Sequence, residues 1–91
     1  MIKKIFFKVY GRVQGIGFRW FVKDIAEKYN IIGWVRNVED GSVEGLASGE
    51  QDKINLFLSE IRNNHPLATV NRVEINDIEE EIPEKTFFIK H

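Results

Sequence analysis

The chain has no cysteine, two prolines and a single methionine among its 91 residues. Without cysteine the protein can form no disulfide, no thiolate nucleophile and no cysteine-based metal site. Long hydrophobic runs are also missing, since no stretch approaches the roughly 20 apolar residues that cross a bilayer. The apolar run near the N-terminus, beside Lys3 and Lys4, is too short for a signal peptide. We therefore expect a cytoplasmic protein.

A basic excess is missing as well, because 13 Lys and Arg residues face 14 Asp and Glu residues and give a net charge of −1. A protein that binds duplex nucleic acid normally carries such an excess to neutralise phosphates. No linker, charge block or internal repeat divides the chain. With 43% hydrophobic residues, the composition is typical of one small globular domain, which we expect to span residues 1–91.

What the chain does contain is a regular alternation of apolar and polar residues. The alternation from Ile5 to Val13 predicts a strand with one face on the core. Gly11 leaves that face thin, so a close approach to the backbone is expected there. The turn signal Asp40-Gly41 between two further runs predicts a β-hairpin. The expected strands are Ile5–Val13, Ile31–Val38, Ser42–Ser48, Thr69–Ile78 and Phe87–Lys90.

Apolar residues at helical spacing predict two amphipathic helices. The first starts near Arg19 and runs to Tyr29. The second has Glu50 and Asp52 in its first turn, where the helix dipole favours them, and ends before His65-Pro66. Its apolar positions are Ile54, Phe57, Leu58 and Ile61.

The resulting order β-α-β-β-α-β, followed by one short strand, is the ferredoxin-like arrangement. Such an α+β fold is a two-layer sandwich with both helices on one face of a mostly antiparallel sheet. We expect the first strand inside the sheet, because each right-handed crossover returns the chain beside its neighbours. Its C-terminal end then meets the following loop in the middle of the domain.

The loop from Gln14 to Phe18 combines two glycines with the arginine that follows it. Gly15 and Gly17 permit backbone angles that turn N–H groups toward one point. Arg19 lies at a helix N-terminus, where the dipole disfavours a cation, and a bound phosphoryl group would suit both features. The glycines by themselves are more typical of a tight turn. The loop is neither a Walker loop nor a dinucleotide fingerprint, since Trp20 stands where a third glycine belongs.

Asn37, near the end of the second expected strand, is the other polar candidate. It alternates with Val35 and so shares the core-facing side, where its amide fits either a structural bond to a loop or a role at a site. His65 and His91 have no obvious Ser or Asp partner, and the acidic run Glu79–Glu81 lacks metal-ligand spacing. Any enzymatic activity would therefore use no covalent nucleophile, metal or protein general base.

Two motifs in the chain resemble the signatures of the acylphosphatase family. The first is Val9-Tyr10-Gly11-Arg12-Val13-Gln14-Gly15-Ile16-Gly17-Phe18-Arg19, which departs from the family at Ile16, where Val or His is usual. The second is Gly33-Trp34-Val35-Arg36-Asn37, followed by Gly41, Val43 and Gly49. The resemblance covers nearly the whole chain and is looser after the second helix, where His65-Pro66 replaces the usual Gly-Pro.

This resemblance implies hydrolysis of a carboxyl-phosphate mixed anhydride to a carboxylate and inorganic phosphate by direct attack of water. It assigns phosphoryl binding and catalysis to Arg19 and orientation of the water to Asn37. The implied phosphate-binding loop consists of Gln14, Gly15, Ile16, Gly17 and Phe18. The implied partners are a small-molecule acyl phosphate and its phosphate product, with no cofactor, nucleic acid or membrane, and we expect a monomer.

Two alternatives stay open from the sequence. The chain could be a non-catalytic or carbamoyl-phosphate-binding module, as in related domains of larger maturation proteins, although a length of 91 residues favours a free enzyme. A single-stranded RNA-binding domain shares the element order, but the expected strand Ser42–Ser48 has no aromatic residue on which a base could stack. Assays with acetyl, benzoyl and carbamoyl phosphate, and a gel shift with RNA, would separate these cases.

Overall fold

The structure is a computed structural model that describes all 91 residues. Its elements follow the predicted order: β1 (Ile2–Arg12), α1 (Phe18–Lys28), β2 (Ile32–Asn37), β3 (Val43–Glu50), α2 (Gln51–Asn63), β4 (Thr69–Asp77) and β5 (Phe87–Ile89). The alternation in β1 is confirmed, since Ile5, Phe7 and Val9 are buried whereas Lys8 and Tyr10 on the other face are partly exposed. None of the helices is long and apolar enough to cross a membrane.

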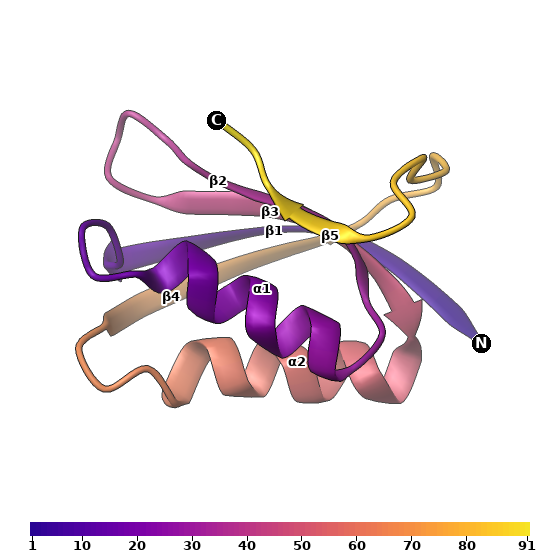
Figure 1. Ribbon diagram of the computed structural model, residues 1–91, viewed down its shortest axis with the longest axis horizontal. Helices are drawn as coiled ribbons and strands as arrows, with labels where there is room; N and C mark the ends of the chain where they lie inside the picture. Colours follow the sequence, from indigo (N-terminus) through magenta and orange to yellow (C-terminus); the bar gives the residue numbers. More distant parts are fainter.

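The five strands form one sheet in the order β4-β1-β3-β2-β5 (Figure 1). β3 pairs antiparallel with both β1 and β2, β1 also pairs antiparallel with β4, and the short β5 runs parallel to β2. The expected ferredoxin-like sandwich, with a mostly antiparallel sheet and β1 in its interior, is therefore confirmed. Because β3 runs opposite to both neighbours, β1 and β2 point the same way and end at the same edge of the sheet.

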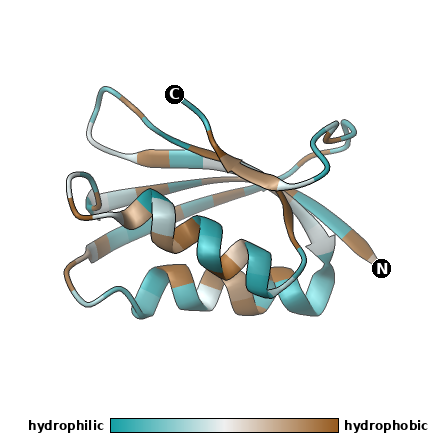
Figure 2. Cartoon of the chain, viewed as in Figure 1, coloured by the Kyte–Doolittle hydropathy of each residue, from teal (hydrophilic) through white to brown (hydrophobic).

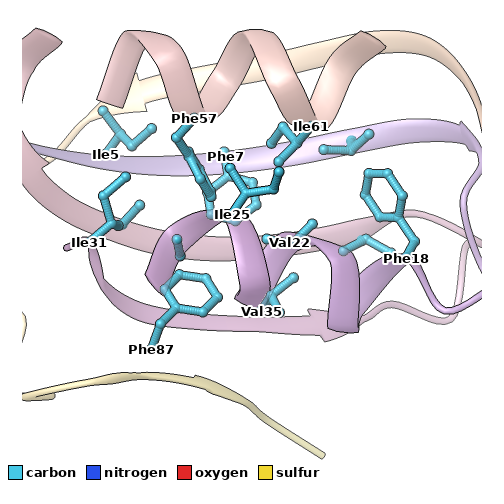
Figure 3. Packing of buried hydrophobic residues seen from close by; sticks show 14 of the residues in the cluster. Ile5, Phe7, Phe18, Val22, Ile25, Ile31, Val35, Phe57, Ile61 and Phe87 are labelled. Atoms are coloured by element: carbon cyan, nitrogen blue, oxygen red, sulfur yellow. The ribbon is translucent and has the colours of Figure 1, made fainter. Parts of the chain in front are cut away.

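Both helices lie on one face of this sheet and enclose the core against it (Figure 1). Hydrophobic and hydrophilic residues alternate along each helix in Figure 2, as expected for helices with one buried side. In Figure 3, Phe57 of α2 points toward Phe7 of β1, and the two rings meet edge to face with centroids 5.5 Å apart. Val22 of α1 is fully buried. Burying one such side chain contributes about 1.5–3 kcal/mol, so the core fixes where the N-terminus of α1 lies.

Two glycines in the strands lie where backbones come close. Gly11 and Gly33 have φ angles of 135° and 141°, and a Cβ atom on either residue would come within 2.0 Å of a carbonyl oxygen, that of Thr69 or Leu46. The close approach predicted at Gly11 is thus confirmed. It falls at a register shift in the pairing of β1 with β4, where an irregular ladder brings the backbones together.

The start of α2 differs from the expectation in one respect. Glu50 is the N-cap residue rather than part of the first turn, and it makes no side-chain cap hydrogen bond. Its carboxylate instead accepts a hydrogen bond from the amino group of Met1 at 2.9 Å. Asp52 does lie in the first turn, and the helix ends at Asn63, shortly before His65-Pro66 as predicted.

Candidate active site

Three segments meet at the edge where β1 and β2 end: the loop of residues 13–17, the first turn of α1, and the turn between β2 and β3 (Figure 1). Gln14, at the start of the loop, connects two of them. Its side-chain nitrogen Nε2 donates hydrogen bonds to the carbonyl oxygens of Val38 at 2.7 Å and Ser42 at 2.9 Å. These bonds hold the loop against the hairpin turn that directly follows Asn37.

Side chains and glycines alternate in the loop. Gln14 is half-buried against the hairpin, Ile16 packs on the core, and Phe18 is 1% exposed. Between them, Gly15 and Gly17 are exposed with φ angles of 77° and 76°, and a Cβ atom on either would meet nothing within 4 Å. Glycine is therefore required here for the left-handed backbone and not for space. The three anchored side chains hold a loop whose exposed surface is main chain.

No capping side chain accepts hydrogen bonds from the backbone N–H groups in the first turn of α1. Gly17 is the N-cap residue, makes no side-chain cap hydrogen bond, and no acidic residue lies in the first turn. The Phe21 N–H donates to the Gly17 carbonyl oxygen at 3.1 Å, so the N–H groups before it precede the helical ladder. The positive end of the helix dipole is thus open beside the loop.

Arg19 adds a full positive charge at this helix end. It is half-buried and takes part in none of the salt bridges of the protein. Arg36 is by contrast paired with Glu44 at 2.6 Å and stacked over Trp34. The helix dipole and the guanidinium of Arg19 together make the electrostatic potential here positive, which favours binding of an anion.

Asn37 is the last residue of β2 and is exposed. It alternates with the buried residues Gly33 and Val35, which places it on the helix-covered side of the sheet, just beyond the core. An amide does bond the hairpin turn, but it belongs to Gln14 and not to Asn37. Of the two roles that the sequence left open for Asn37, the structural bond to the hairpin is therefore made by Gln14 instead.

The hairpin turn after Asn37 has its own hydrogen-bond network. Asp40 Oδ1 accepts hydrogen bonds from the backbone N–H and the hydroxyl of Ser42, and Lys8 Nζ lies 3.3 Å from Oδ2. These contacts, the Ser42 hydroxyl foremost, lower the pKa of Asp40 from 3.8 to about 2. Asp40-Gly41 predicted the hairpin, but the role of Ser42, which is 2% exposed, was missed. The Asp-x-Ser spacing of an Asx turn is the signal that would have found it.

Other reactive groups do not gather at this edge. No group of three or more His, Asp or Glu side chains could hold a metal ion. His65 is half-buried, and its ring packs edge to face on Phe21 with centroids 5.0 Å apart. Its Nδ1 accepts the Leu67 backbone N–H at 3.0 Å. His91, at the C-terminus, is exposed.

The two surface hollows of the protein lie away from this edge. One of about 360 Å³ opens at the other end of α1, between Asn30 and Lys85, and one of about 270 Å³ lies near Met1 and Asp77. No residue of the loop, and neither Arg19 nor Asn37, lines them. The candidate site is thus an open main-chain surface suited to a small group.

The fold and this edge define a class of protein, the ferredoxin-like sandwiches with a glycine-containing loop between the first strand and the first helix. The acylphosphatase family model matches residues 5–89. An acylphosphatase of Clostridium acetobutylicum is 40% identical over 89 residues, which cover 98% of each chain. One of Thermococcus kodakarensis is 43% identical over 68 residues, 75% of each chain. The chain belongs to the acylphosphatase family, and its activity is the hydrolysis of acyl phosphates.

Solved structures agree with this assignment. The crystal structure of an acylphosphatase from Bacillus subtilis superposes with a TM-score of 0.93 and 34% identity, covering all of both chains. The structure of full-length HypF in a phosphate- and nucleotide-bound form contains a similar region, with a TM-score of 0.87 and 31% identity over the whole of this chain and 12% of that one. The same fold therefore occurs both in proteins of this length and within a larger protein.

The pKa of Asp40 predicts how the hairpin beside Asn37 responds to acid. Because this pKa is lowered from 3.8 to about 2, the carboxylate stabilises the fold fully above about pH 4, and the contribution is lost as the pH falls through 2. We expect Asp40→Asn to lower the melting temperature at pH 5 and to have a much smaller effect near pH 2. Thermal unfolding followed by circular dichroism measures both values.

Glu39→Gln is the matched control, because Glu39 is exposed, lies next to Asp40 and takes part in none of the salt bridges. It removes the same charge and should leave the melting temperature unchanged at both pH values. An equal loss of melting temperature for Asp40→Asn at pH 5 and pH 2 would show that the charged form of Asp40 does not stabilise the turn.

Proposed function

We propose that the phosphoryl group of the acyl phosphate binds at the N-terminus of α1, between the loop and Arg19. The observation that carries this proposal is an arginine at a helix start that has no capping side chain, no acidic residue in the first turn and no salt-bridge partner. A cation opposes the helix dipole there, at a cost of about 0.3–1 kcal/mol at an exposed position. A bound dianion offsets this cost, because it interacts favourably with both the positive end of the helix dipole and the guanidinium.

The loop takes part through its main chain. The side chains of Gln14, Ile16 and Phe18 are engaged with the hairpin or the core, so the N–H groups of Gly15 through Phe18 are the donors offered to the phosphoryl oxygens. Left-handed residues next to right-handed ones form concave N–H arrangements that bind anions. Arg19 adds a planar, permanently charged donor matched to two phosphoryl oxygens.

These N–H donors and the guanidinium provide most of what the reaction requires. Water attacks phosphorus, a P–O bond forms to the water oxygen, and the bond from phosphorus to the acyl oxygen breaks with release of a carboxylate. The carboxylate is a good leaving group, so the site has no need of a strong acid. The transition state is loose, with negative charge spread over the phosphoryl oxygens, and fixed donors at those oxygens lower its energy. The proton of the water passes to a phosphoryl oxygen of the substrate.

Asn37 orients the attacking water. Its neutral amide has no useful basicity, but its oxygen can accept and its nitrogen can donate a hydrogen bond. Its position at the end of β2, on the helix-covered side, supports this role because the loop and the start of α1 lie at the same edge. Holding water in line with the breaking bond removes part of the entropy cost of the attack.

The protein further acts as a cytoplasmic monomer that binds no nucleic acid. The net charge of −1 supports the absence of nucleic acid binding. Large exposed apolar side chains are scattered over different elements, such as Trp20 on α1, Leu56 on α2 and Phe88 on β5. Single exposed residues of this kind do not make the contiguous patch that a stable dimer interface needs.

Arg19→Ala tests phosphoryl binding. The variant loses a charged donor used by both substrate and transition state, so KM should rise and kcat should fall by about 10²–10³-fold. The measurement is steady-state hydrolysis of benzoyl phosphate. Arg62→Ala on the exposed side of α2 removes the same charge and should leave both constants unchanged. Full activity of Arg19→Ala would eliminate the proposed role.

Asn37→Ala tests orientation of the water. We expect kcat to fall by about 10²-fold, the effect of a misplaced reactant, while the inhibition constant of inorganic phosphate changes little. Asn55→Ala, which removes an exposed amide from α2, is the control for both constants. If phosphate affinity collapsed and kcat stayed intact, Asn37 would be a phosphate ligand and the assignment of roles would be reversed.

A further inference from the structure

The amide of Gln14 lies across the base of the hairpin turn that follows Asn37. Its Nε2 donates to the carbonyl oxygens of Val38 and Ser42, at 2.7 Å and 2.9 Å. These are the two ends of the turn, since the Val38 N–H also donates to the Ser42 carbonyl oxygen at 2.9 Å. Both hydrogens of the amide nitrogen are therefore used by the hairpin, and none is left for a substrate.

This arrangement defines which side chain can serve at position 14. Two carbonyl oxygens must face a nitrogen that carries two hydrogens, so the amide can adopt only one orientation. A glutamate of the same length would place a carboxylate oxygen against both carbonyls. A methionine of similar length and no charge would leave both carbonyls without this donor.

No other hydrogen bond joins the loop to the hairpin. Among the backbone bonds outside the helices and strands, those at this edge connect residues 38–42 with one another and Gly17 with Phe21, and none connects the loop with the hairpin. The loop and Asn37 thus lie on separate elements, whose overall spacing the sheet sets through β3. At the site itself, Gln14 is the one side chain that hydrogen-bonds the loop to the hairpin turn. Asn37 is one residue before Val38, so a shift of the turn moves it directly.

We propose that Gln14 is a positioning residue that sets the distance between the phosphoryl-binding loop and the water held by Asn37. The inference rests on the proposed roles of Arg19 and Asn37. Phosphoryl affinity depends on the loop and Arg19, and with Gln14 removed the loop keeps its two other anchors, Ile16 and Phe18 on the core. The alignment of water with phosphorus depends on both elements together. Loss of the Gln14 amide therefore lowers kcat and leaves phosphate binding nearly intact.

The first test is Gln14→Met, with Gln51→Met as the matched control at the only other glutamine, which is exposed at the start of α2. For Gln14→Met we expect kcat on benzoyl phosphate to fall about 10- to 100-fold, as for a reactant displaced by about 1 Å, with the inhibition constant of inorganic phosphate changed less than about 3-fold. Gln51→Met should match the unaltered protein. An unchanged kcat, or equal losses of kcat and phosphate affinity, would overturn the proposal.

Gln14→Glu provides a readout that a purely structural role would not give, and it serves if Gln14→Met does not fold. At neutral pH the carboxylate repels the Val38 and Ser42 carbonyls; at pH 5 and below a growing protonated fraction can donate one hydrogen bond. The ratio of its kcat to that of the unaltered protein, measured at each pH, should rise as the pH falls. Gln51→Glu should show a constant ratio, and a constant ratio for Gln14→Glu would contradict the proposal.

These outcomes are distinct from failure of the proposed roles. If Arg19→Ala or Asn37→Ala kept full activity, the site would lie elsewhere, whatever the Gln14 variants did. If both lost activity as expected and Gln14→Met did not, the site would stand and Gln14 would have no part in its alignment.

Discussion

The site depends on one constraint, the antiparallel pairing of β3 with strands on both sides. This pairing makes β1 and β2 run in the same direction, so that the loop after β1 and the last residue of β2 reach the same edge of the sheet. The start of α1 lies at the same place because the helix begins directly after the loop. Main-chain donors and a guanidinium from one continuous stretch, residues 15–19, thereby reach the same edge as the neutral amide of Asn37.

The chemistry at this edge uses left-handed backbone at two glycines and an unpaired positive charge, both supported by the rest of the fold. Gly15 and Gly17 adopt a left-handed backbone at little cost in free energy. Phe18, the first residue of α1, is buried in the core and anchors the end of the loop. An uncapped helix start with a cation on it is unfavourable by itself and becomes favourable when an anion is bound. The substrate thus completes the electrostatics of the protein, which is the condition for strong stabilisation of charge in the transition state.

Much of this could be predicted from the sequence because it is local. Alternation in β1, helical spacing around Phe57 and the Asp40-Gly41 turn each report their own element, and the element order then determines the sheet. The residues of the candidate site came from two motifs that resemble a family. What the sequence could not show were contacts between segments. The amide of Gln14 reaches the hairpin across 24 positions, and His65, just after the end of α2, packs against Phe21 of α1.

The central claim is that the exposed main chain of the loop and the start of α1 form the phosphoryl site. Titration of the ¹⁵N-labelled protein with inorganic phosphate, followed by two-dimensional ¹H–¹⁵N NMR, tests it most directly. The account predicts saturable shifts that are largest at the backbone N–H groups of Gly15, Gly17, Phe18 and Arg19. Saturable shifts confined to another part of the surface, with these four resonances unmoved, would contradict it.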